Sequence, residues 1–173
     1  MVAETALEPG WLKLEITENC LLEDLAAADA VLAAIHELGI HCAIADFGVG
    51  FASLSYVRRL SVDSLKIDRE LVSAIDSDAR DQGVVQAIVG MVHALGITVV
   101  AAGVQRATQH DALRNARCDL IQGHLLASAA SIEQLFELSA EGETENRMFY
   151  VYSGERSTQA ADPSSWGEVF FDL

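Results

Sequence analysis

The stretch that decides the fold runs from Ala43 to Asp68 and has the sequence AIADFGVGFASLSYVRRLSVDSLKID. Residues 41–45, where it opens, form a brief uncharged segment that is typical of a buried strand. Asp46 follows this segment, and Gly48 and Gly50 allow the backbone to turn tightly beside the carboxylate. Polar chemistry in α/β enzymes gathers at the carboxyl ends of strands. The stretch therefore predicts a site at a strand end, with a solvated turn as the plainer alternative.

A second short strand is expected at residues 64–68, where the sequence is SLKID. Lys66 stands between Leu65 and Ile67, and successive side chains of a strand point to opposite faces. Lys66 is therefore expected on the opposite face of the sheet from its two apolar neighbours, where it could reach a polar site at the strand ends. The alternative is an edge strand that carries a surface lysine.

These two motifs resemble the EAL family of cyclic di-GMP phosphodiesterases, whose usual wording is close to DDFGTGYSSLSYL followed by LKID. The resemblance continues upstream in residues 14–18, LEITE, and downstream in residues 101–105 and in Gln122 with Gly123. It covers roughly residues 2 to 130, and the set of spaced motifs is highly specific.

The chain alternates predicted strands with predicted helices, which implies an α/β fold with a parallel sheet or barrel. The resemblance selects a partial TIM-type (β/α) barrel of the EAL kind. Glycines end the two long helices, and Ser77 or Asp78 is expected to cap the second. Besides the strands above, strands are expected at 11–16, 98–102 and 120–126, and helices at 24–38, 79–95 and 108–116. The residues expected to face the core from the two long helices are Leu25, Ala28, Val31, Leu32, Ile35 and Leu38 in the first, and Val84, Ile88, Met91, Val92 and Leu95 in the second.

The resemblance implies that residues 1–130 are the C-terminal part of an EAL-like barrel, and the change in composition after them marks residues 131–173 as an acidic extension. The extension holds nine acidic residues against two arginines, a net charge of −7. Aromatic residues make it too apolar for an ordinary disordered tail. We expect residues 148–152 to form a strand or dock on the barrel, with residues 169–171 packed nearby, whereas residues 131–138 could form a helix.

The balance of eleven basic against twenty-six acidic residues, a net charge of −15, argues against nucleic-acid polymers and anionic membranes as partners. No leader segment or long apolar run is seen, so a soluble cytoplasmic protein is expected. Cys20, Cys42 and Cys118 lie in apolar surroundings without metal-ligand spacing, which predicts reduced core thiols.

The resemblance implies a site in which two divalent cations, Mg²⁺ or Mn²⁺, activate a water that attacks a phosphodiester. Hard cations of this kind need several carboxylate ligands. The family roles fall on polar residues of the quoted motifs: metal ligands at Glu15, Asp46 and Asp68, the catalytic positions Lys66 and Gln122, and Glu18 as the residue that steadies the glycine-rich loop.

Three positions depart from the family pattern. The first aspartate of the family's pair, which would bridge both metals, is Ala45, and the carboxylates of the later motif are replaced by Ala102 and Gln105. The EAL tripeptide itself belongs to a part of the domain outside this sequence. With too little negative charge between them, two cations would repel each other, so a two-metal phosphodiesterase is not expected.

Three functional hypotheses follow. The first is a degenerate EAL-type domain without catalysis, an interaction or regulatory module in cyclic di-GMP signalling that could bind cyclic di-GMP itself. The alternative is an active or weakly active, metal-dependent cyclic di-GMP phosphodiesterase, which another subunit could complete, and the third is a structural remnant. Because an open barrel exposes apolar strand edges, we also expect a homo-oligomer, a protein partner or the tail to cover the open side.

Overall fold

The computed structural model describes residues 9–49, 54–125, 148–150 and 168–172. Its centre is a sheet whose first five strands are parallel and neighbours in chain order. This arrangement of strands alternating with helices confirms the predicted α/β partial barrel. The strands are β1 (Lys13–Thr17), β2 (His41–Phe47), β3 (Ser64–Ile67), β4 (Thr98–Ala101) and β5 (Leu120–Gln122).

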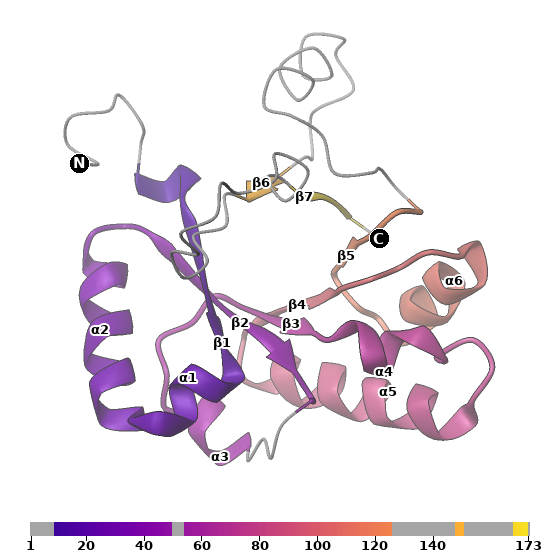
Figure 1. Cartoon of the computed structure of the whole chain (residues 1–173), viewed down its shortest axis with the longest axis horizontal. Coiled ribbons are helices and arrows are strands. Elements are labelled where there is room, and N and C mark those ends of the chain that lie inside the picture. Colours follow the sequence, from indigo (N-terminus) through magenta and orange to yellow (C-terminus); the bar gives the residue numbers. More distant parts are fainter. Residues whose placement is uncertain (1–8, 50–53, 126–147, 151–167, 173) are drawn as a thin grey trace, which may run out of the picture.

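Helices connect these strands and lie together on one side of them (Figure 1). The helix predicted over residues 131–138 falls outside the described residues. The observed helices are α1 (Glu18–Glu23), α2 (Leu25–Glu37), α3 (Leu54–Val57), α4 (Arg69–Ser73), α5 (Ala79–Ala94) and α6 (Ala107–Asn115), and a short 3-10 helix covers Pro9–Trp11. None of the described helices is both long and apolar enough to cross a membrane.

Capping residues fix the ends of the two long helices. Asp24 accepts a hydrogen bond from Ala27 N at the start of α2, and Asp78, rather than Ser77, accepts one from Arg80 N at the start of α5. Each of the two helices is followed by a glycine with positive φ. Glycine adopts this left-handed conformation with the least strain, so it commonly ends a helix.

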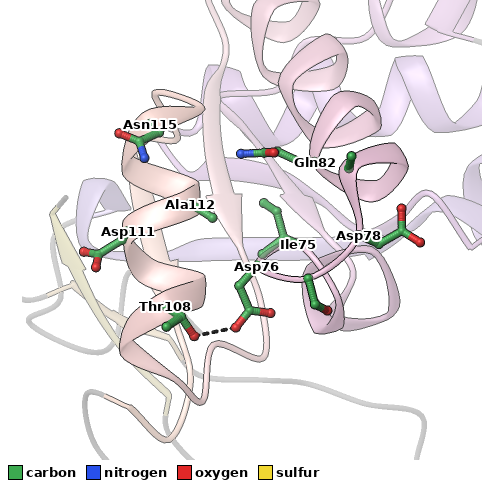
Figure 2. Close-up of a pocket in the computed structure, with 10 residues that line it drawn as sticks. Ile75, Asp76, Asp78, Gln82, Thr108, Asp111, Ala112 and Asn115 are labelled. Carbon is green, nitrogen blue, oxygen red and sulfur yellow. Dashed lines mark hydrogen bonds between the residues drawn. The ribbon is translucent and has the colours of Figure 1, made fainter.

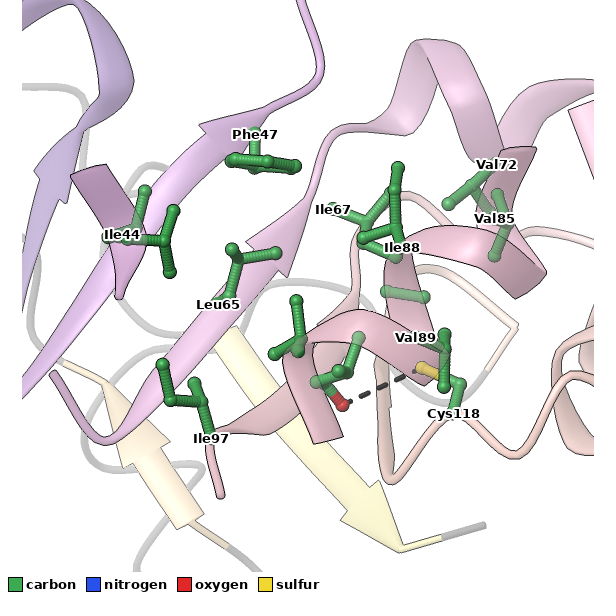
Figure 3. Close-up of a cluster of buried hydrophobic side chains, with 14 of the residues drawn as sticks. Ile44, Phe47, Leu65, Ile67, Val72, Val85, Ile88, Val89, Ile97 and Cys118 are labelled. Atoms are coloured by element: carbon green, nitrogen blue, oxygen red, sulfur yellow. Dashed lines mark hydrogen bonds between the residues drawn. The ribbon is translucent and has the colours of Figure 1, made fainter. Parts of the chain in front are cut away.

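The main core lies between the helices and one face of the sheet (Figure 3). Ile44, Leu65 and Val99 are neighbours across β2, β3 and β4, and all three are fully buried. Figure 3 shows Ile88 of α5 beside Ile67 of β3, and Val85 of α5 close to Val72 of α4. A continuous apolar layer of this kind is what holds a helix against a parallel sheet.

The helix faces differ from the predicted ones. Val31 and Leu38 are 55% and 64% exposed, because α2 buries a narrower face, around Leu32, than the spacing suggested. In α5, Ile88 and Val92 are buried as predicted, but Val84 is exposed and Val85 and Val89 are buried in addition.

The cysteine prediction is confirmed in part. All three cysteines are free; Cys42 and Cys118 are buried, but Cys20 is exposed on α1. The Cys118 thiol donates to the carbonyl of Val99 at 3.6 Å, and burial raises its pKa to about 12. A thiol of this kind is inert packing and does not act as a nucleophile.

Two strands near the C-terminus extend the sheet beyond β5. Strand β7 (Glu168–Asp172) pairs with β5 in the antiparallel sense, with Phe171 opposite Ile121, and β6 (Met148–Tyr150) pairs with β7. Figure 1 shows both strands on the side of the sheet away from the helices. The backbone of β7 therefore occupies the hydrogen-bonding edge that β5 would otherwise expose.

Candidate functional site on the inner face of the sheet

The sheet has a second face, turned away from the helices, which we call the inner face. The strand registers show which residues lie on this face, because side chains alternate between the two faces along each strand and paired residues of neighbouring strands share a face. The face carries polar groups on both flanks of an alanine strip. Its residues are Lys13, Glu15 and Thr17 from β1, His41, Ala43 and Ala45 from β2, Ser64 and Lys66 from β3, Thr98 and Val100 from β4, and Leu120 and Gln122 from β5.

An ion pair crosses the inner face. Lys66 Nζ lies 2.7 Å from Glu15 Oε2 and 3.0 Å from Glu15 Oε1, so both carboxylate oxygens accept from one ammonium group. Each side chain is only 11% exposed. The pair can form because β2, which separates the two strands, presents only the small side chains of Ala43 and Ala45 beneath it. Lys66 thus lies on the face that the strand alternation predicts.

A second crossing runs parallel to the first. Lys13 Nζ donates to Ser64 Oγ at 3.1 Å, again from β1 to β3. Burial lowers the pKa of Lys13, although the nearby carboxylates of Asp63 and Glu15 act in the opposite direction. Two lysines therefore tie the first strand to the third over an apolar floor.

Asp46 was predicted to follow the strand that ends at residue 45, but it lies inside β2. β2 continues to Phe47, and its register with β3 shifts between Ile44 and Phe47. Asp46 has a φ of 55° and is exposed. Such a left-handed residue is what lets a strand insert one extra position, and it removes this carboxylate from the regular alternation of the inner face.

Asp68 also has a structural role. Its Oδ1 accepts from Glu70 N at 2.7 Å and caps the start of α4. Gln122 is buried on β5; its main-chain oxygen accepts from Val104 N, while its side-chain Oε1 has no partner among the described residues.

Glu18 is the first residue of α1, and its side chain is buried. Carboxylates are rarely buried without a partner. Its Oε2 accepts from Gly48 N at 3.1 Å, which fixes the backbone just after β2. A side chain on Gly48 would collide with Leu71, because the Cβ position lies 2.3 Å from Leu71 Cδ1. The residues beyond, 50–53, lie outside the described part of the chain.

Of the three altered family positions, Ala45 is buried and contributes no ligand to the inner face. Ala102 follows β4, and Gln105 donates its backbone N–H to Gln109 Oε1 at 2.8 Å. Sequence reasoning missed Gln109, which is buried and whose Nε2 donates to the carbonyl of Val72. The available signal was its spacing, since a glutamine three residues into a helix often reaches back to the helix start.

The residues present do not fit a two-metal centre. Glu15 is already paired with Lys66, and Asp68 accepts a hydrogen bond from Glu70 N at the start of α4. Ala45 is buried and has no side-chain oxygen that could bind a metal. Across the described residues no group of three or more histidine, cysteine, aspartate or glutamate side chains could hold a metal ion. A hard cation would have to displace an ammonium group that neutralises its ligand.

A pocket of about 430 Å³ lies elsewhere, between the turn that leads into α5 and the helix α6 (Figure 2). Its central carboxylate, Asp76, is bound to Arg106 at 2.7 Å and to Thr108. Hydrogen bonds from these two residues hold the pKa of Asp76 well below its ordinary range. The pocket contains none of the predicted site residues, and Asp76 joins the turn before α5 to the start of α6.

The motifs on the inner face and the fold that carries them agree with one family. The family model for the EAL domain matches residues 1–129. This chain belongs to the EAL family. The match covers β1 to β5 and the helices α1 to α6, and it stops before the acidic extension.

Curated relatives come from signalling proteins. The EAL-family chain is 37% identical over 134 residues to the cyclic di-GMP phosphodiesterase NbdA of Pseudomonas aeruginosa, and 37% identical over 130 residues to the bifunctional diguanylate cyclase and phosphodiesterase MucR of the same species. These matches cover 78% and 75% of this chain but 17% and 19% of the relatives. The chain therefore spans less than a fifth of their length.

Solved structures agree with the family assignment. The PaMucR phosphodiesterase in complex with c-di-GMP is 36% identical with a TM-score of 0.73, over 78% of this chain and 54% of that one. The EAL domain of Mycobacterium smegmatis DcpA is 34% identical with a TM-score of 0.76, over 82% and 63%. Klebsiella pneumoniae BlrP1, 34% identical with a TM-score of 0.68 over 72% of this chain and 32% of that one, was solved with manganese and c-di-GMP.

Proposed function

We propose that this chain is a cytoplasmic EAL-type module of cyclic di-GMP signalling that does not hydrolyse the dinucleotide and acts by contact with another protein. The family gives the signalling context, since NbdA and MucR are both named for cyclic di-GMP chemistry. The state of the inner face argues for the loss of catalysis. Fold alone does not decide activity, because chemistry resides in the site.

The ion pair between Lys66 and Glu15 is the observation that carries this proposal. In the family's arrangement Glu15 would bind a metal and Lys66 would lie near the attacked phosphate. Here the two groups neutralise each other at 2.7 Å. Ala45 supplies no negative charge that could hold a cation beside them. Metal-dependent hydrolysis needs open coordination positions and a positioned water, and this pair leaves Glu15 available for neither.

The decisive experiment is a hydrolysis assay with cyclic di-GMP in manganese buffer, read by chromatography of the linear dinucleotide. The EAL domain of MucR serves as the active reference, and the K66A variant of this chain gives the background. We expect the wild-type chain and K66A to give the same trace. Product from the wild-type chain above the K66A background would refute the proposal.

A calorimetric titration separates binding from catalysis. Cyclic di-GMP is titrated into the purified chain with and without manganese, and E15A is measured as the matched variant. We expect manganese alone to give no stoichiometric heat. A manganese signal that vanishes in E15A would show that the metal site is retained, against the proposal.

A second candidate is a cyclic di-GMP phosphodiesterase completed by another polypeptide. It is favoured by one observation: Lys66 and Gln122, the two family catalytic positions, are both buried on the same inner face. The solved EAL domains are longer than the part this chain covers, so further ligands could come from outside it. Activity that appears only after a second EAL-type polypeptide is added would favour this candidate.

The proposed partner contact lies on the open side of the barrel. Strand β1 has β2 as its only neighbour among the described strands, and β6 forms the other end of the sheet. We propose that residues 1–130 form the module and residues 131–173 an extension of it, with a second copy or another protein at the free edge. Light scattering at micromolar concentration tests self-association, and a monodisperse monomer would exclude the second copy.

A further inference from the structure

Strand β7 lies beside β5 in the sheet although a long stretch of chain separates the two strands (Figure 1). β5 ends at Gln122 and β7 begins at Glu168, so residues 123–167 lie between them. The strands are antiparallel, and two residues are enough to join an antiparallel pair in a hairpin. The connection is therefore far longer than the pairing requires, and its length does not restrict β7 to the β5 of its own chain.

The attachment of β7 to the sheet is short. Three residue pairs join it to β5: Leu120 with Asp172, Ile121 with Phe171, and Gln122 with Phe170. On its other side β7 pairs with β6, again over three residues. Among the described elements, β5 and β6 are the ones that β7 contacts most extensively. The two strands β6 and β7 can therefore leave the edge of β5 together, while the five parallel strands and their helices stay in place.

The edge of β5 needs a strand, but it does not need this particular copy of β7. An edge strand presents a row of backbone N–H and C=O groups, and an added strand satisfies them through its own backbone. The β7 of a second copy has the same sequence and fits the same register as the β7 of the first. Domain swapping uses this equivalence, because two copies exchange an identical element at low cost.

We propose that the outer edge of β5 is an interface between copies of this chain, at which the β7 of one copy replaces the β7 of the other. Each copy then donates β6 and β7 and accepts those of its partner, so the pairing of β5 with β7 is kept in both. A tethered strand competes for its own edge at an effective concentration in the millimolar range, so exchange increases as the chain approaches that concentration. The inference rests on the proposed role in protein contacts and names the surface that makes them.

Disulfide trapping between full-length chains tests the exchange. Leu120 and Asp172 are opposite each other across β5 and β7, a spacing that a disulfide can bridge. L120C in one chain is mixed with D172C in another and oxidised, both in a C20S background because Cys20 is the exposed cysteine of the three. We expect a covalent dimer of one L120C chain with one D172C chain. Its yield should be roughly tenfold higher at about 0.5 mM chain than at about 5 µM.

V169C is the matched control for D172C. Val169 lies three positions away along β7, where it is out of register with Leu120. Equal yields of mixed dimer from V169C and D172C would show random collision and overturn the interface. The absence of any mixed dimer at the higher concentration would refute the exchange as well. If L120C does not fold, Q122C with F170C repeats the test at another pair of the same register.

The double variant L120C/D172C separates this inference from the proposed function. Oxidised at low concentration, it locks β7 onto the β5 of its own chain. We expect light scattering to show that the locked chain stays monomeric at concentrations where the reduced chain associates. Association that persists in the locked chain would place the contact on another surface, such as the free edge of β1, and would overturn the exchange while leaving the proposed interaction role intact.

Discussion

Lys66 Nζ lies 2.7 Å from Glu15 Oε2, although the two residues belong to strands that do not touch. The side chains meet above Ala43 and Ala45 of the intervening strand. Taking either charge out of water alone would cost several kcal/mol, so each group makes the burial of the other tolerable. The small alanine side chains of β2 thus leave room for the ammonium group of Lys66 to reach the carboxylate of Glu15.

Replacing one member of the Lys66–Glu15 pair should destabilise the fold more than the loss of a single surface charge does, and replacing both members should cost less than the sum of the two single losses. We expect K66M and E15Q each to lower the free energy of unfolding by about 3–5 kcal/mol, because each leaves a buried charge without its counter-charge. The double variant E15Q/K66M should lose less than the sum, with a coupling of about 1–3 kcal/mol. Urea denaturation of the four proteins gives these values, with R114M on the exposed face of α6 as the control. Additive losses would mean that the two groups do not stabilise each other.

Asp63 should make the protein sensitive to acid. Burial by itself would raise the pKa of Asp63, but the hydrogen bond from Cys42 N, at 2.8 Å, and the contact with His41 bring it below the ordinary value of 3.8. A carboxyl whose pKa is lower in the folded state stabilises the fold above its unfolded pKa, and this stability is lost as the pH falls toward the folded pKa.

The D63N variant tests this linkage. We expect its melting temperature to fall less steeply than that of the wild type between about pH 5 and pH 2, since the amide has no proton to gain. The D29N variant on α2 should keep the wild-type slope. Parallel curves for D63N and the wild type would contradict the expectation.

Gly123 should not tolerate a side chain. It has a φ of 154°, and a Cβ atom there would lie 2.2 Å from the carbonyl oxygen of Val104, which is backbone and cannot rotate away. We expect G123A to lose about 1–3 kcal/mol of stability through overpacking. G90A is the matched control: Gly90 lies in α5 with nothing within 4 Å of the Cβ position, so alanine should gain about 0.5–1 kcal/mol. Equal effects in the two variants, measured by chemical denaturation, would argue against this account.

Deleting everything after Gly142 should expose the edge of β5. The deletion removes β6 and β7, and with them the backbone that pairs with Leu120, Ile121 and Gln122. An unpaired strand edge promotes association between sheets. We therefore expect the truncated chain to melt at a lower temperature and to aggregate at concentrations where the full chain does not. A truncated chain that is equally stable and monodisperse would show that the tail strands contribute nothing.

The sequence by itself determined the family, the alternation of strands and helices and the position of each long helix. These features depend on local chemistry: glycines that end helices, aspartates that cap them, and apolar runs of strand or helix length. The motif around Asp46 and Lys66 was sufficient to indicate an EAL-type barrel, whereas the defective metal site inferred from Ala45 stays a prediction.

Only the tertiary structure decided what the surviving polar residues do. Lys66 and Glu15 are separated by fifty-one positions, so their ion pair depends on strand order and register. In the same way Asp68 is a helix cap, Asp46 lies within an irregular strand, and Glu18 reaches Gly48 thirty positions away. A side chain's partner is set by what the fold brings within about 3 Å of it, and no local pattern specifies that.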